Sequence, residues 1–173
     1  LQRIISLKNE VYHCIHFDAK TRAMKAPFSA LLYCFSTIDL FGSVYTGKFN
    51  ESNTENAKCY MKNMMLYSDS QIDFLQEIFR HKLVHTAEPK WLYKKNSEYY
   101  SWSCYRNSRG KHLKFYVLDK AAHANDFSIS AWSLVEDIIN SVYKNDGYLN
   151  KVLKKEGDVF DNFVKVFNKI SSP

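Results

Sequence analysis

Cysteines are few in this chain of 173 residues, and no two of them form a C-x-x-C pair. The four are widely scattered, at Cys14, Cys34, Cys59 and Cys104. An even number alone does not make a disulfide framework in a chain of this length, so we expect free, mostly buried thiols in a reducing compartment, the cytoplasm. Low-complexity segments and internal repeats are missing too, and 46% of the residues are hydrophobic, which excludes a disordered chain. We predict one domain over residues 1–173.

Long apolar runs and familiar catalytic loops are also absent. No apolar run approaches the length of a membrane span, and no signal peptide precedes the first predicted helix, so we expect no membrane association. Walker-type loops, G-x-G-x-x-G, H-E-x-x-H and G-x-S-x-G are missing. His13 and His16 lie three residues apart without obvious further ligands, so we predict neither a metal nor another cofactor. The net charge of +6 permits a polyanionic partner without demanding one.

Hydrophobic residues at three- and four-residue intervals predict that most of the chain is helical. The predicted helices cover residues 1–18, 28–45, 52–65 behind a capping box at residues 52–55, 68–88, a stretch from Asp126 or Ser128–Ser130 to Gly147, and 149–167, where Gly157-Asp158 is a candidate break. The helix after Pro27 is apolar nearly all round, so we expect it at the centre of a bundle. Asp39 inside it needs a partner. This partner is either a group on a neighbouring helix or loop, or Arg80, which Asp39 would hold in place for a substrate.

The pattern changes to period two after Pro89, which indicates β-structure. Strands are predicted at residues 91–93, 99–105 and 113–118, and residues 106–110 would form the connecting turn. Tyr100, Trp102 and Cys104 would share one face of their strand. The sequence therefore predicts a small antiparallel β-hairpin or three-stranded sheet, inserted at residues 91–118 into a mainly α fold.

A basic stretch, Arg80-His81-Lys82-Leu83-Val84-His85, ends the predicted helix 68–88. Ser68 and Gln71 form a capping box at the start of that helix. Residues 72, 75, 79 and 83 are apolar and should share a buried stripe, whereas residues 77, 80, 81, 84 and 85 should face solvent. An always-charged guanidinium beside imidazoles that titrate near neutral pH suits phosphate chemistry.

The stretch resembles the Arg-(polar)-x-x-x-His signature of the HEPN superfamily, a group of helical proteins that includes many metal-independent ribonucleases. Arg80 and His85 supply the two ends of the signature and His81 its polar position, and an apolar helix bearing residues 37–42 precedes it, as in many HEPN-like chains. The resemblance implies a HEPN-like helical bundle. It also implies a homodimer in which two motifs face one cleft and the RNA 2′-hydroxyl attacks the adjacent phosphate.

The resemblance assigns roles to individual residues. His85 would be the general acid or base, Arg80 would bind the phosphate, and His81 would orient the RNA or the catalytic histidine, with Asp39 and Glu77 as supporting residues. His81 departs from the commoner Asn or Asp, so either imidazole could carry the proton. The implied function is a metal-independent endoribonuclease, in a defence or toxin-like system, with RNA, a second copy and a protein regulator as partners.

A different class of function is kept open: a non-catalytic HEPN-like module that binds RNA, a nucleotide or a protein. The predicted β insertion is rich in cations that could hold RNA phosphates, with Tyr99 and Tyr105 to stack bases. These cations are Lys94, Lys95, Arg106, Arg109, Lys111 and Lys114. Charges on an edge strand also prevent sheets from pairing with one another, which is the structural alternative.

Overall fold

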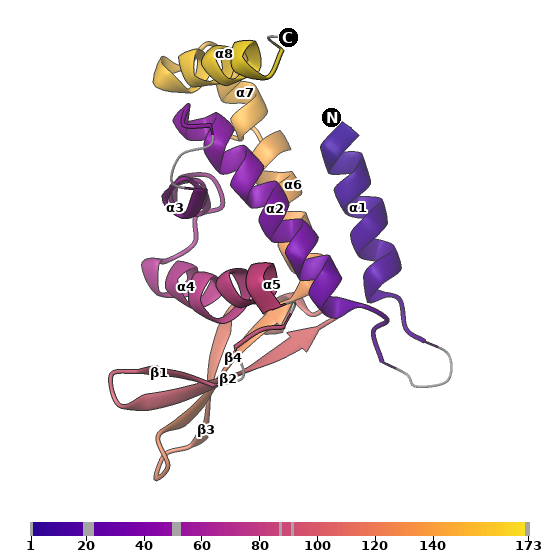
Figure 1. Cartoon of the computed structure of the whole chain (residues 1–173), viewed down its shortest axis with the longest axis vertical. Helices are drawn as coiled ribbons and strands as arrows, with labels where there is room; N and C mark the ends of the chain where they lie inside the picture. The colour runs from indigo at the N-terminus through magenta and orange to yellow at the C-terminus, as the bar shows by residue number, and fades with distance from the viewer. Residues whose placement is uncertain (1, 19–22, 50–52, 87, 91, 172–173) are drawn as a thin grey trace. The chain divides into compact units, whose positions relative to one another are not determined.

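The computed structural model describes residues 2–18, 23–49, 53–86, 88–90 and 92–171 (Figure 1). The helices are α1 Gln2–Ile15, α2 Pro27–Thr46, α3 Asn53–Asn63, α4 Asp69–Phe74, the π-helix η1 Leu75–Arg80, α5 His81–Thr86, the 3₁₀ turn η2 Arg109–Lys111, α6 Ala131–Tyr143, α7 Tyr148–Leu153 and α8 Gly157–Ser171. The strands are β1 Tyr93–Lys95, β2 Glu98–Tyr105, β3 Lys114–Asp119 and β4 Ala124–Ser130.

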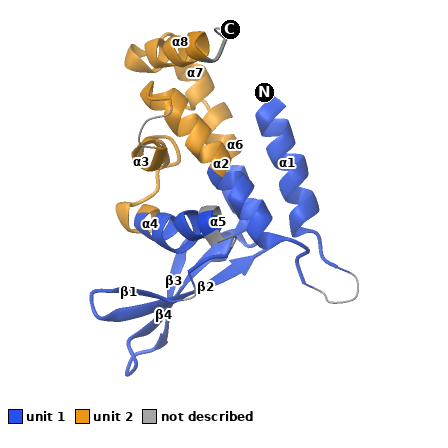
Figure 2. Cartoon of the chain, viewed as in Figure 1, with its two compact units in different colours: residues 1–35, 73–136 blue, residues 36–72, 137–173 orange. Residues whose placement is uncertain are grey.

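The chain forms two compact units (Figure 2). Unit 1 combines Leu1–Phe35 with Asp73–Glu136 and contains the whole sheet. Unit 2 combines Ser36–Ile72 with Asp137–Pro173 and, within the described residues, is helical. Each unit is therefore assembled from two segments that are distant in the sequence.

The sheet has four strands in the order β1-β2-β4-β3, and β2 and β4 are parallel. The predicted fold, a HEPN-like helical bundle with an antiparallel hairpin or three-stranded sheet, is thus wrong, because β4 lies between the two strands that were expected to pair. The sequence predicts that a helix begins at Asp126 or at Ser128–Ser130, whereas residues 124–130 form β4. In the structure those polar groups are buried and hydrogen-bonded, so the segment can serve as a central strand.

The connection from β2 to β3 passes over β4, which lies between them, and is therefore not the predicted hairpin turn at residues 106–110. Hydrogen bonds hold this connection in place. The Ser108 amide donates to Ser130 Oγ at 3.0 Å, and the Trp132 amide donates to the Arg106 carbonyl at 3.0 Å. Buried His112 accepts a hydrogen bond at Nδ1 from the Ser130 amide, at 3.1 Å. These bonds fix residues 106–112 against the end of β4 and the start of α6.

One face of the sheet holds the aromatic core of unit 1. Tyr100 and Trp102 lie on this face together, as predicted from their spacing. The Phe74 ring, at the end of α4, lies 4.5 Å from the ring of Tyr100 and 5.4 Å from that of Phe127. Phe79 of η1 contacts Trp102 with ring centroids 5.9 Å apart. The segment around η1 therefore covers one face of the sheet.

Unit 2 is built around Tyr60, which is fully buried. Its ring stacks on Phe41 at 5.7 Å and lies 6.5 Å from the ring of Tyr148. Its hydroxyl forms a 2.8 Å hydrogen bond with Ser141 Oγ. Burial raises the pKa of Tyr60, so this phenol stays protonated near neutral pH.

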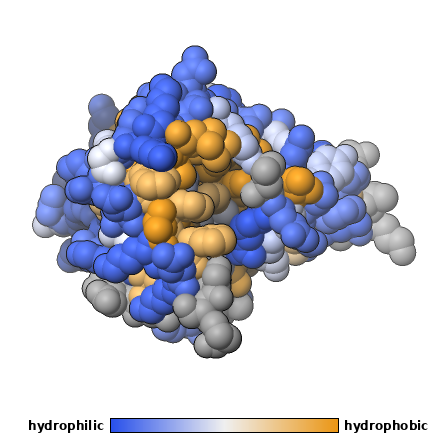
Figure 3. All heavy atoms as spheres, turned by 90° about the horizontal axis from the view of Figure 1, so that it is seen from above, coloured by the Kyte–Doolittle hydropathy of each residue, from blue (hydrophilic) through white to orange (hydrophobic). Residues whose placement is uncertain are grey.

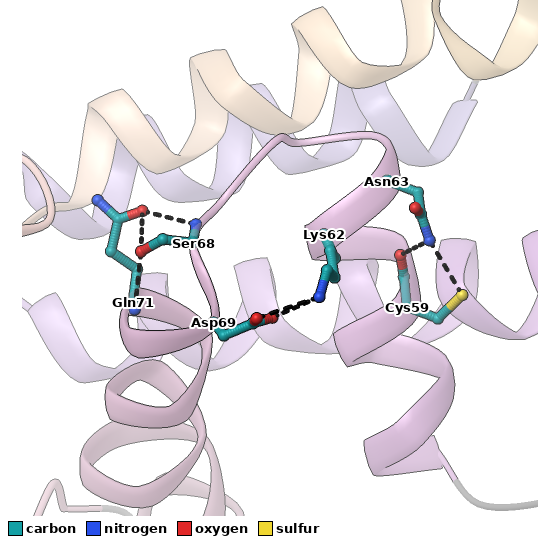
Figure 4. A network of polar contacts seen from close by, with 6 residues as sticks. All are labelled: Cys59, Lys62, Asn63, Ser68, Asp69 and Gln71. Atoms are coloured by element: carbon teal, nitrogen blue, oxygen red, sulfur yellow. Dashed lines mark hydrogen bonds and ion pairs between the residues drawn. The ribbon is translucent and has the colours of Figure 1, made fainter.

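The predicted capping box at the start of α4 is confirmed (Figure 4). The Ser68 amide donates to Gln71 Oε1 at 3.0 Å, and the Gln71 amide donates to Ser68 Oγ at 3.3 Å. The Lys62 ammonium lies 2.8 Å from the Asp69 carboxylate and links α3 to the same helix start. Side chains near Ser68 therefore satisfy two backbone donors that helix geometry leaves free.

The expectation of no apolar run of membrane-spanning length needs a correction at α2. Polar residues such as Asp39 interrupt its sequence, yet α2 is long and apolar enough to cross a membrane by length and composition. The same helix buries Leu31, Phe35 and Ile38 in the core. A core helix passes the same test of length and composition, so this finding alone is weak evidence for a membrane segment.

Hydrophobic side chains also reach the surface, and Figure 3 shows a face on which they gather within a hydrophilic surround. In unit 2 the exposed large hydrophobic residues include Leu153 and Phe167. In unit 1 they include four consecutive residues of the edge strand β3, Phe115 to Leu118. The run on β3 is contiguous in the sequence, whereas single exposed hydrophobic residues are normal on a protein surface.

Candidate nucleic-acid interface

The basic stretch begins at the end of a π-helix, η1. Its side chains are therefore not buried as they would be in a regular α-helix. The His81 amide donates to the Gln76 carbonyl, five residues earlier, instead of the four of an α-helix. The predicted apolar stripe is confirmed, since residues 72, 75, 79 and 83 are all buried. The predicted exposure of Arg80 is wrong, because Arg80 is only 8% exposed. A wider turn rotates the residues after Leu75 away from α-helical positions, and this brings Arg80 inward.

The remaining residues of the basic stretch differ in exposure. His81 and His85 are exposed, and Glu77 is half-buried. Pro89 is buried, and the next residue bonds back to η1, since the Lys90 amide donates to the Ile78 carbonyl at 2.8 Å. The structure thus offers two imidazoles to solvent while it shields the guanidinium.

Asp39 lies in unit 2, on the wall of a small hollow with Leu40, Ser43, Phe49 and Asn53. Arg80 belongs to unit 1, so the pairing of Asp39 with Arg80 stays a prediction. Among the residues that the structure describes, no group of three or more His, Cys, Asp or Glu side chains could hold a metal ion.

The four cysteines are free. Only Cys34 is fully buried, whereas the other three are half-buried. Burial raises the pKa of Cys104 to about 12 and raises that of Cys34 further. Both thiols therefore remain protonated near neutral pH, which makes them weak nucleophiles.

The second face of the sheet carries polar and aromatic side chains, and we call it the open sheet face, although the β4 residues on it, Asp126, Ser128 and Ser130, are buried. Alternation along β2 and its register with β4 and β3 place Tyr99, Ser101, Ser103, Tyr105, Lys114 and Tyr116 there. A hollow of about 500 Å³ on this face is lined by Tyr105, Lys111, Tyr116 and Asp126, among others. The Lys111 ammonium lies 4.4 Å from the centre of the Tyr105 ring, within cation–π range.

A second cavity, which we call the aromatic pocket, has a volume of about 560 Å³. Its walls are Tyr12, Ile15, Phe17, Tyr105, Arg106, Asn107, Ser108 and Trp132. All of these residues belong to unit 1. Tyr105 lines both the pocket and the hollow on the open sheet face, so the two sites adjoin.

The six cations predicted to bind RNA separate into three groups. Lys94, Lys111 and Lys114 are exposed, and the Lys94 ammonium lies over the ring of Tyr99, at 5.3 Å. Arg106 lines the aromatic pocket. Lys95 and Arg109 instead form ion pairs with acidic residues of unit 1. These pairs are Lys95 with Asp73 at 3.2 Å and Arg109 with Glu136 at 2.8 Å.

Helices α1 and α6 also contribute to this region, which no pattern in the sequence predicts. Tyr12, Phe17 and Trp132 were read only as parts of helices or their ends, yet they form pocket walls with Tyr105. A large aromatic residue on the polar side of an amphipathic helix, such as Tyr12, was the available signal. Whether such a residue lines a pocket depends on which rings from distant parts of the chain lie beside it.

The chain was compared with protein-family models, with curated proteins and with solved structures, and none of them matches. Function is therefore argued from the geometry of the site itself.

Proposed function

We propose that this protein binds single-stranded RNA on the open sheet face. The observation that carries the proposal is the pairing of tyrosine rings with lysine ammonium groups on that face, Lys94 with Tyr99 and Lys111 with Tyr105. Tyr116 adds a further ring that is 39% exposed.

Two separate forces would hold a single strand there. Bases stack on exposed rings, and each such contact contributes about 1–3 kcal/mol. Lysine ammonium groups attract the phosphates and release counterions, which makes the affinity depend on salt. A sheet that presents aromatic side chains is one of the recurrent surfaces for RNA, since unstacked bases lie flat on it. The exposed lysines, the exposed rings of Tyr99 and Tyr116 and the half-buried ring of Tyr105 support this mode without requiring a deep cleft.

The test of this function is the binding of a labelled, unstructured oligouridine, followed by fluorescence anisotropy across a salt series. The double variant Lys111→Gln/Lys114→Gln is expected to bind about tenfold more weakly. Its slope of log affinity against log salt should be shallower by about 1.4, because each lost phosphate contact removes about 0.7.

The matched control is Lys58→Gln/Lys62→Gln, which removes the same charge from lysines paired with Glu55 and Asp69 in unit 2. Its affinity and salt slope should stay close to those of the unaltered protein. If both double variants lose the same affinity, the attraction is nonspecific and the open sheet face is not the binding site.

A second candidate function is metal-independent RNA cleavage at the basic stretch that resembles the HEPN signature. The observation that favours it is the π-turn that ends at Arg80, since π-turns occur often at functional sites, together with exposed His81 and His85. An imidazole there could move a proton during attack by the 2′-hydroxyl. The shielded position of Arg80 is why binding is placed first.

Cleavage is tested with mixed tRNA and total RNA in EDTA. His85→Ala is expected to lower the rate by about 10²–10⁴-fold, and the products should carry 2′,3′-cyclic phosphates. His13→Ala, which removes an exposed histidine of α1, is the control and should retain full activity. Equal rates for His85→Ala and the unaltered protein would show that the cleavage comes from another site or from a contaminant.

A further inference from the structure

The aromatic pocket leaves large rings open to solvent. Tyr12 is 47% and Phe17 is 46% exposed, although both line the pocket together with buried Ile15. The Tyr12 and Trp132 rings are 6.2 Å apart and inclined at 74°, so they form two walls of a corner rather than a closed stack. A corner of this kind leaves ring faces available to a flat ligand.

A cation that lacks an anionic partner stands at this corner. The Arg106 guanidinium lies over the Phe17 ring at 5.0 Å, and within the described part of the chain no carboxylate pairs with it. Arg109, three residues later, differs from Arg106 because it already has partners: its guanidinium donates to Glu136 and to the Ser133 carbonyl. Arg106 is thus the arginine of this segment that remains available for an anion from outside.

The polar side chain next to it is also available. Asn107 is exposed, and its amide forms no hydrogen bond with the residues that the structure describes. The backbone that presents it is held in place, because the Arg106 carbonyl accepts from the Trp132 amide and the Ser108 amide donates to Ser130. A fixed backbone with free donors and acceptors is what a preorganised binding site needs.

We propose that the aromatic pocket binds a nucleobase that carries a phosphate. The base lies against the rings of Tyr12 and Trp132, the Asn107 amide bonds its polar edge, and the Arg106 guanidinium binds the phosphate. The volume of about 560 Å³ falls in the usual range for small-molecule sites. The inference rests on the proposed RNA-binding function in one respect, since Tyr105 joins the pocket to the open sheet face. A nucleobase with a phosphate is present both in a free mononucleotide and in the terminal nucleotide of an RNA, so the pocket could bind either.

The test uses the full chain labelled with ¹⁵N and follows the indole signal of Trp132, which the variant Trp132→Phe identifies. Titration with AMP or UMP is expected to shift this signal. Arg106→Gln should weaken the binding of AMP about tenfold, the usual worth of one charge-assisted hydrogen bond, and leave the binding of adenosine unchanged. Arg109→Gln removes the same charge from the same segment and should leave AMP binding unchanged.

RNA with and without a 5′-phosphate distinguishes the two sources. A shift of the Trp132 signal with AMP alone identifies a free nucleotide as the ligand, and a stronger response to 5′-phosphorylated RNA identifies an RNA end. The proposal is overturned if neither probe moves the Trp132 signal, or if the two arginine variants lose AMP binding equally. If RNA binds through Lys111 and Lys114 while the indole signal of Trp132 does not shift, the pocket assignment fails and the proposed function stands.

Discussion

Phe74→Ala is expected to lower the free energy of unfolding by about 3–5 kcal/mol, the cost of truncating a fully buried phenylalanine. Phe74 is 2% exposed, and its ring contacts Tyr93, Tyr100 and Phe115 at centroid distances of 5.3, 4.5 and 4.9 Å. Alanine would leave a cavity between the helical segment and three strands of the sheet.

Urea denaturation followed by circular dichroism measures this change. Val117→Ala is the control, because Val117 lies on β3 of the same sheet and is 61% exposed. It should change stability by less than about 0.5 kcal/mol, as is usual for surface substitutions. A loss of less than about 1 kcal/mol for Phe74→Ala would mean that the aromatic core on this sheet face is not packed as described.

Gly42→Ala is expected to destabilise the protein by about 2–3 kcal/mol, although alanine normally favours a helix by about 1 kcal/mol over glycine. A Cβ atom at Gly42 of α2 would lie 2.6 Å from the Asn56 carbonyl oxygen and 2.8 Å from the Ala57 nitrogen of α3. Both are backbone atoms, so no rotation of a side chain can relieve the clash. The two helices would have to separate.

Separation of these helices would also break hydrogen bonds. The Thr46 hydroxyl of α2 donates to Asn56 Oδ1 of α3 at 2.8 Å, and the Asn56 amide donates to the Lys48 carbonyl, just after α2, at 2.8 Å. Thermal unfolding of Gly42→Ala is compared with that of Gly110→Ala, where an added Cβ meets nothing within 4 Å. If Gly42→Ala melts at the same temperature as Gly110→Ala, the close approach of α2 and α3 is not real.

The candidate site was predicted only in part. Lys94, Lys111, Tyr99 and Tyr105 were chosen from their basic and aromatic character, and the structure places them in two cation–ring pairs. Lys95 was chosen on the same grounds but lies against Asp73. Composition identifies a basic segment, whereas it does not show which of its charges another part of the chain has already neutralised.

The sequence by itself determined the local elements and their apolar sides. The buried stripe that includes Leu75 and Leu83, the capping box at Ser68, and the common face of Tyr100 and Trp102 all follow from spacing within one element. Such patterns are local because each residue's side of a helix or strand depends only on its neighbours in the chain.

Only the tertiary structure decided the strand order, the burial of Arg80 and the aromatic pocket. β4 enters the centre of the sheet because partners from distant segments satisfy its buried serines, and one π-turn moves Arg80 inward. The pocket joins Tyr12, Tyr105 and Trp132 from three separate elements or their ends. Contacts between residues far apart in the sequence set the strand order and the pocket, and the wider π-turn shifts Arg80 out of the regular α-helical repeat, so a simple periodicity predicts none of the three.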